Sequence, residues 1–159
     1  ACEWLPLILH CPTPEAMLKE CRALANDNID AWVHAAAVLD YVVEAPAEGK
    51  LASQQGSLNL ALTESPKHIM ELKDACASGV RIGFKLESGI KQKDLIHRAY
   101  AQIQKAEMTA VVANRLEDLG DSSKPRGYLV DQQGAHFVLE STDELNDALQ
   151  TLIERGKVN

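Results

Sequence analysis

The chain has 159 residues, of which 46% are hydrophobic and 25% are charged, a composition typical of a globular domain with a hydrophobic core. Its net charge of −7 argues against a nucleic-acid partner, although a local basic pocket could still hold an anion. No apolar run approaches the roughly 18–20 residues that cross a membrane, so we expect no membrane partner and no secretory signal.

The four cysteines, Cys2, Cys11, Cys21 and Cys76, form no CxxC pair and have no histidine at metal-ligand spacing. We therefore expect buried, reduced thiols in a cytoplasmic protein, without a disulfide framework and without a protein-built metal site.

The first part of the chain predicts two strands and a helix between them. Residues 5–10 form a short apolar run. Thr13-Pro14-Glu15 reads as a helix N-cap, a first-turn proline and an acidic first turn, and apolar residues then recur at helical spacing. The run over residues 31–39 is almost free of polar side chains, which predicts an interior strand buried on both faces. A polar loop with proline and glycine leads from there to Lys50.

The middle of the chain continues the alternation. Leu58, Leu60 and Leu62 alternate with polar or small residues, which predicts a strand over residues 57–63 with its leucines buried on one face. A helix is expected to begin at Ser65-Pro66 and to stop at Gly79. Strands over residues 80–86 and 109–113 then enclose another helix.

The last part predicts an antiparallel hairpin from residues 127–130 and 135–139, followed by a helix that begins with the capping box Ser141-x-x-Glu144. The whole pattern favours a single α/β domain over residues 1–159. We expect a Rossmann-like, mainly parallel sheet flanked by helices, with an antiparallel hairpin near the C-terminus.

Five short motifs follow one another along the chain. They are Ala35-Ala36-Ala37-Val38-x-Asp40-Tyr41, Gly49-Lys50-Leu51-x-Ser53, Ser65-Pro66-Lys67-His68-Ile69, Gly83-Phe84-Lys85-Leu86-Glu87 and Val111-Val112-Ala113-Asn114-Arg115-Leu116. In order and spacing they resemble the phosphopantothenoylcysteine synthetases, also called phosphopantothenate–cysteine ligases. The resemblance covers nearly the whole chain.

This resemblance implies a nucleotide-dependent ligase of coenzyme A biosynthesis that forms a C–N bond. Such an enzyme uses CTP or ATP with Mg²⁺ to activate the phosphopantothenate carboxylate as an acyl-nucleotide. It then transfers the acyl group to the amine of cysteine. The resemblance also implies a homodimer.

By the same resemblance, Lys50 and Asn114 are expected to be catalytic. The residues expected to bind the nucleotide are His34, Ala35, Ala36, Asp40, Lys50, Pro66, Lys67, His68, Ile69 and Phe84. The ammonium of Lys50 suits charge that develops on phosphates, and Phe84 could either stack on a base or pack in the core. We expect His34 to be a strand histidine with satisfied hydrogen bonds rather than an acid or base. A solvated loop residue is the simpler alternative for Asp40 and for Lys50.

Two features depart from the family pattern. The sequence lacks the family's glycine-rich loop and its S-N-x-S-x-G segment, so we expect an N-terminally incomplete ligase domain. Lys105 has Ala101, not a basic residue, four positions before it, which favours a solvated helix face for Lys105. A non-catalytic nucleotide- or partner-binding module of the same fold remains an alternative. An unrelated dinucleotide enzyme is less favoured because the sequence has no G-x-G-x-x-G.

Overall fold

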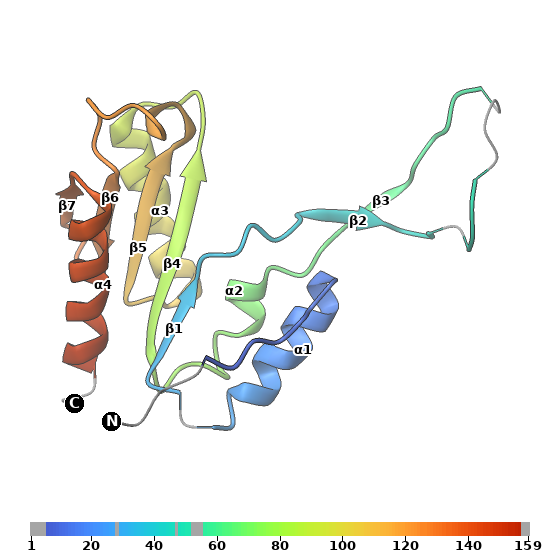
Figure 1. The fold of residues 1–159 in the computed structure, drawn as a ribbon, viewed down its shortest axis with the longest axis horizontal. Coiled ribbons are helices and arrows are strands. Elements are labelled where there is room, and N and C mark those ends of the chain that lie inside the picture. Colours follow the sequence, from blue (N-terminus) through green and yellow to red (C-terminus); the bar gives the residue numbers. More distant parts are fainter. Residues whose placement is uncertain (1–5, 28, 47, 52–55, 157–159) are drawn as a thin grey trace.

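The structure is a computed structural model, and it describes residues 6–27, 29–46, 48–51 and 56–156. A five-stranded sheet in the order β1-β4-β5-β6-β7 forms the body, and a separate two-stranded ribbon, β2–β3, projects from it (Figure 1). The strands are β1 Ala31–His34, β2 Tyr41–Val43, β3 Leu62–Glu64, β4 Val80–Glu87, β5 Ala110–Arg115, β6 Gly127–Asp131 and β7 His136–Leu139. The helices are α1 Pro14–Leu24, α2 His68–Glu71, α3 Gln92–Ala106 and α4 Thr142–Gly156, with a 3-10 turn, η1, at Leu116–Asp118.

The sheet has a parallel core with an antiparallel hairpin at one side. β1 pairs parallel with β4, and β4 pairs parallel with β5. β6 is antiparallel to β5 and forms a hairpin with β7. The expected α/β fold, with a parallel core, flanking helices and a C-terminal hairpin, is confirmed.

Two apolar layers hold the sheet between helices. One face packs against α3, which buries Leu95, Ala99, Ile103 and Ala106 along one stripe of helical spacing. The other face packs against α4 through Leu145 and its neighbours (Figure 1). Within the described residues, no helix is both long and apolar enough to cross a bilayer.

Two helices, α1 and α4, begin where the sequence signals predict, whereas the helix expected to begin at Ser65-Pro66 begins at His68. The Thr13 side chain accepts a hydrogen bond of 3.1 Å from the Ala16 backbone N–H, as an N-cap should. The Ser141 hydroxyl accepts one of 3.1 Å from the Glu144 N–H at the start of α4. Local side-chain chemistry therefore fixes where these helices begin.

The prediction of an interior strand over residues 31–39 is wrong. The strand ends at His34, and β1 lies at the edge of the described sheet with β4 as its neighbour. Ala35, Ala36 and Ala37 are exposed. An apolar run is buried on both faces only where strands flank it on both sides and layers cover it, and among the described residues β1 has one neighbouring strand.

Other local predictions also fail around the projecting ribbon. Leu58, Leu60 and Leu62 are 63%, 59% and 56% exposed, and only residues 62–64 form a strand. The helix expected to run to Gly79 has four residues and continues as turns. Residues 6–10 form no strand. Leu5, Cys2 and Ser53 lie outside the described residues.

The thiols agree in part with expectation. Cys76 is buried, whereas Cys11 and Cys21 are half-buried, and all three are free. Burial raises the pKa of the Cys76 and Cys21 thiols, which keeps both groups protonated at neutral pH.

The core layer under α3 makes a stability prediction. Leu95→Ala should lower the free energy of unfolding by about 2–5 kcal/mol, because Leu95 is fully buried and its truncation leaves a cavity. Leu116→Ala is the matched control, since Leu116 is 56% exposed and should change stability by less than about 1 kcal/mol. Urea denaturation of both variants measures the difference, and equal losses would contradict this account of the core.

Candidate functional site

A cleft of about 620 Å³ opens where β1, β4 and β5 reach their carboxyl ends. Every site residue predicted from the sequence except Lys50 lines it: His34, Ala35, Ala36, Asp40, Pro66, Lys67, His68, Ile69, Phe84 and Asn114. These residues span three strand ends and the start of α2, so the fold brings four of the five motifs together. Lys50 is exposed in the segment that joins β2 to β3 and does not line the cleft.

The cleft is locally basic in an acidic protein. Its described lining carries three cations, Lys67, Lys85 and Arg126, and one carboxylate, Asp40. Clustered cations on concave walls concentrate anionic ligands. The charge of the cleft therefore favours a phosphate- or carboxylate-bearing ligand.

Lys85 is held at the cleft by a short ion-pair network. Its ammonium lies 3.0 Å from Glu87, and the same carboxylate pairs with Arg98 of α3 at 2.8 Å. Partial burial acts to raise the pKa of Glu87, but Lys85 and Arg98 outweigh it and hold that pKa below its usual value. Glu87 therefore stays ionised and keeps Lys85 in place as a cation.

Asn114 and Phe84 present different chemistry to the cleft. The Asn114 Nδ2 donates a hydrogen bond of 2.6 Å to the Arg126 backbone carbonyl. Phe84 is half-buried, packs against the apolar layer beneath α4 and also lines the cleft. Phe84 thus combines the two alternatives raised by the sequence, a core contact and a ring available at the wall.

His34 differs from expectation. Its Nε2 is buried and has no hydrogen-bond partner among the described residues, so the prediction of a satisfied histidine is wrong. The ring stacks on Trp32 with centroids 6.4 Å apart. Burial, together with the charges of Arg81 and His68, lowers the pKa of His34 to about 4. The imidazole is therefore neutral at physiological pH.

A buried arginine fixes the segment that carries Ile69. Arg81, on β4, is 2% exposed and donates hydrogen bonds to the carbonyls of Ala106 (2.5 Å) and Ile69 (2.7 Å). One guanidinium thus joins the end of α3, β4 and α2. Burial lowers the pKa of Arg81, but an arginine remains charged at neutral pH.

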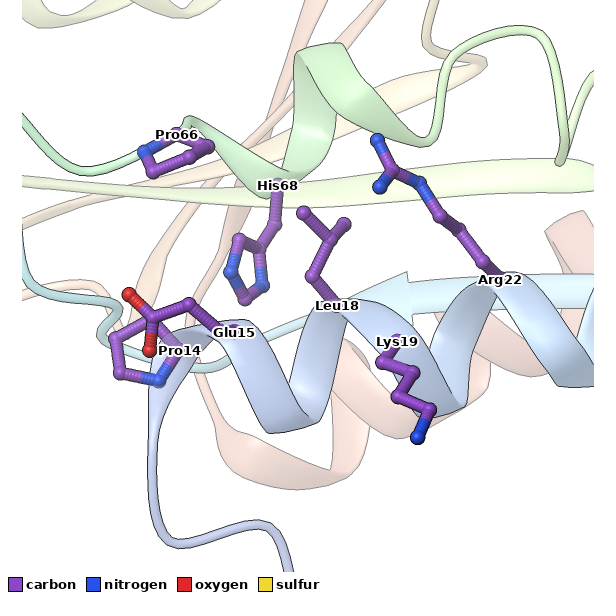
Figure 2. Close-up of a pocket in the computed structure, with 7 residues that line it drawn as sticks. All are labelled: Pro14, Glu15, Leu18, Lys19, Arg22, Pro66 and His68. Carbon is purple, nitrogen blue, oxygen red and sulfur yellow. The ribbon is translucent and has the colours of Figure 1, made fainter.

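His68 separates the cleft from a smaller pocket of about 290 Å³ between α1 and the α2 segment. Figure 2 shows the His68 ring extending from α2 toward the first turn of α1, beside Leu18. Burial lowers the pKa of His68, and its hydrogen bond to the Pro14 backbone opposes that shift. The Nδ1 atom is enclosed and has no partner among the described residues, so His68 acts mainly as a packed wall.

The described residues hold no group of three or more His, Cys, Asp or Glu side chains that could bind a metal ion. Asp40 is the carboxylate of the cleft lining. Mg²⁺ is commonly held by one or two carboxylates together with substrate phosphates. The described donor set is therefore compatible with Mg²⁺ that arrives with a nucleotide.

Lys85, Gln102 and Arg126 also line the cleft with polar side chains, and they were not predicted as site residues. Lys85 lies inside the motif over residues 83–87, and its place next to Phe84 was the sequence signal that could have identified it. Gln102 sits on α3 and Arg126 precedes β6, and nothing in their sequence context marks them.

Comparison with known proteins gives a consistent family. Residues 8–155 match the model of the DNA/pantothenate metabolism flavoprotein C-terminal domain. The chain is 38% identical over 109 residues to the coenzyme A biosynthesis bifunctional protein CoaBC of Thermococcus kodakarensis, covering 68% of this chain and 27% of that protein. It is 38% identical over 90 residues to phosphopantothenate–cysteine ligase 2 of Oryza sativa, covering 55% of this chain and 27% of the relative. The matched regions thus span about a quarter of these relatives.

Solved structures show the same fold at lower identity. The DNA/pantothenate metabolism flavoprotein of Streptococcus pneumoniae superposes with a TM-score of 0.75 at 18% identity, covering 95% of this chain and 76% of that one. A Cab2 mutant in complex with phosphopantothenate-cysteine gives a TM-score of 0.65 at 17% identity, covering 89% of this chain and 50% of that one.

The buried His34 makes a prediction about pH. Because its pKa falls from 6.5 to about 4 on folding, the unfolded chain binds the proton more tightly. His34 should therefore cost stability as pH drops below about 6.5, with the loss complete near pH 4. His34→Met should flatten the pH dependence of the urea midpoint over this window.

His97→Met, at an exposed position of α3, controls for the substitution itself. An NMR titration of the His34 ring with a midpoint near 6.5 would contradict the prediction.

Proposed function

The chain belongs to the family of the DNA/pantothenate metabolism flavoprotein C-terminal domain, the phosphopantothenate–cysteine ligase part of CoaBC proteins, and we propose that it carries out the nucleotide-dependent step of that ligation. Residues 1–159 would form a single phosphopantothenoylcysteine synthetase-like domain that works in the cytoplasm. The observation that carries the proposal is the basic cleft, which gathers four sequence motifs at one edge of the sheet.

The proposed reaction needs a cleft of this kind. A carboxylate is a poor electrophile, so CTP or ATP first converts the phosphopantothenate carboxylate into an acyl-nucleotide with loss of pyrophosphate. The amine of cysteine then displaces the nucleotide and forms the amide. Both steps bring several negative charges together and require that water be kept from the activated acyl group.

The residues of the cleft suit these requirements. Lys67, Lys85 and Arg126 can neutralise phosphate and carboxylate charge in a partly enclosed site. The ring of Phe84 can pack against a base or the pantothenate chain. The small side chains of Ala35 and Ala36 let a ligand approach the backbone at the end of β1. Mg²⁺, when bound with the nucleotide beside Asp40, would screen charge on the phosphates.

A non-catalytic nucleotide-binding module is the second candidate. It is favoured by the exposed position of Lys50 outside the cleft. The two candidates differ in one measurable step: a ligase forms acyl-nucleotide only when phosphopantothenate is present, whereas a binding module retains nucleotide affinity and forms none.

Lys50 supplies the sharpest test of the ligase mechanism. In the full-length protein, Lys50→Gln should lower the single-turnover rate of acyl-nucleotide formation by about 10²-fold or more. The reason is that the ammonium would act on charge that builds as pyrophosphate leaves, while nucleotide affinity should change less. Folding should be unaffected because Lys50 is exposed.

Lys105→Gln, on the exposed face of α3, is the matched control and should react at the wild-type rate. Equal rates for wild type and Lys50→Gln would remove Lys50 from the mechanism. Nucleotide binding without any acyl-nucleotide in the wild type would favour the binding module.

We also propose that the β2–β3 ribbon pairs with a second copy of the chain. A two-stranded ribbon is marginally stable alone in water. Tyr41 and Leu62 of its strands are each more than half accessible, and so are Leu58 and Leu60 in the segment that leads into β3. The ribbon projects from the body of the molecule (Figure 1). Exposed apolar side chains gathered on a projecting element are typical of an interface, and a two-fold dimer would use the same ribbon of both copies.

Charged substitutions at the exposed leucines test the proposed dimer. Leu58→Asp combined with Leu60→Asp should convert a dimer into a monomer in sedimentation equilibrium, because each carboxylate would be buried without a partner in the interface. Leu116→Asp, at an exposed leucine outside the ribbon, is the control. A wild-type protein that is monomeric at micromolar concentration, or a double variant that remains dimeric, would exclude the ribbon as the interface.

A further inference from the structure

The side-chain amide of Asn114 is held by the turn that leads into β6. We call its position the seat, which is formed by the Arg126 carbonyl and the space beside Gly127. The amide Nδ2 donates to the Arg126 carbonyl at 2.6 Å. Only the nitrogen of the amide can face a carbonyl oxygen at this distance, since two oxygens would repel each other. The hydrogen bond therefore fixes the orientation of the amide and leaves Oδ1 and the second N–H for a ligand.

The seat exists because residue 127 is a glycine. The β5–β6 register pairs Ala110 with Asp131 and Ala113 with Tyr128, so one further step places Gly127 opposite Asn114. A Cβ on Gly127 would lie 2.5 Å from the Asn114 Nδ2 and 3.0 Å from the Ala113 carbonyl. The first separation is too short for any side chain, so the Asn114 amide occupies the space that a Cβ would fill.

The same turn also supplies charge to the cleft. The Arg126 backbone carbonyl accepts the hydrogen bond from the Asn114 amide, and both Arg126 and Asn114 line the cleft. Gly127 itself is buried and does not line the cleft. A change at Gly127 can therefore reach a ligand only through Asn114 or through the backbone of β5.

We propose that Gly127 is a positioning residue, which together with the Arg126 carbonyl holds the Asn114 amide in the one orientation that serves the ligand of the cleft. The expected loss of kcat/KM rests on the proposed function, whereas the expected change in the Asn114 amide does not. The ligand group that meets Oδ1 has to be a hydrogen-bond donor, such as a hydroxyl, an amide N–H or an ammonium.

The kinetic test compares three variants of the full-length protein: Gly127→Ala, Asn114→Ala and the double variant. Gly127→Ala should lower kcat/KM by about 10-fold to 10²-fold, because a displaced contact group loses most of its effect. Asn114→Ala should cost at least as much. The double variant should be no slower than Asn114→Ala, because the group that Gly127 positions is already absent.

Two kinetic results would overturn the proposal. Gly127→Ala could retain wild-type kcat/KM. Alternatively, it could slow the Asn114→Ala protein by the same factor as the wild type, which would trace the effect to the Ala113 backbone contact. Asn114→Asp tests the seat without changing Gly127. A carboxylate cannot donate a hydrogen bond to the Arg126 carbonyl, so this variant should lose the seat although its side chain has nearly the same shape.

An NMR measurement separates failure of the seat from failure of the proposed function. The side-chain amide of Asn114, assigned by its disappearance in Asn114→Ala, should exchange slowly in the wild type, and its resonances should shift and exchange faster in Gly127→Ala. This result is expected whether or not the protein ligates phosphopantothenate. An unchanged Asn114 amide in Gly127→Ala would refute the seat, even in a protein with full ligase activity.

Discussion

The parallel pairing of β1, β4 and β5 is the constraint on which the cleft depends. Parallel strands bring their carboxyl ends to one edge, so His34, Phe84 and Asn114 arrive on the same side of the sheet although they are far apart in sequence. The antiparallel β6 then begins at the edge where β5 ends, and this brings Arg126 to Asn114. Reversing any one of these strands would move its contribution to the opposite edge, some 15–20 Å away for a strand of about five residues.

Beside this sheet, the short helix α2 is held by the apolar contacts of Ile69 and Met70 and by one polar contact from the buried Arg81. Four helical residues bury too little surface to fix a helix on their own. The Arg81 guanidinium supplies the anchor through Ile69, and hydrogen bonds from charged donors contribute about 1.5–3 kcal/mol each. Burying the charge carries a desolvation cost that these bonds offset. The wall formed by Lys67 and His68 is therefore positioned by Arg81, a buried residue that does not line the cleft.

The sequence predicted the elements whose signals are local. The Thr13 cap, the Ser141 capping box and the C-terminal hairpin follow from side-chain chemistry and periodicity. The strands predicted at residues 80–86 and 109–113 lie at residues 80–87 and 110–115 in the structure. Four of the five motifs also predicted residues that share the cleft, whereas Lys50 of the remaining motif does not line it. The errors arise where burial depends on elements far away in the sequence. The apolar run over residues 31–39 does not reveal how many strands flank it. Alternating leucines predict a buried face even where the segment projects from the sheet. Arg126 and Gly127 gain meaning only through the register of β5 and β6.

The ribbon and the cleft share a boundary, and this links the two proposals made for them. The Ser65 backbone N–H donates to the Asp40 carbonyl at 2.8 Å, which closes the base of the ribbon, and both residues line the cleft. Fixing the ribbon in a dimer would thus also fix one wall of the cleft. Lys50 lies beyond this base, in the segment between β2 and β3. The position of the ribbon therefore decides whether the Lys50 ammonium can reach a phosphate in the cleft, so ligand binding and ribbon position should be coupled in the reaction that we propose.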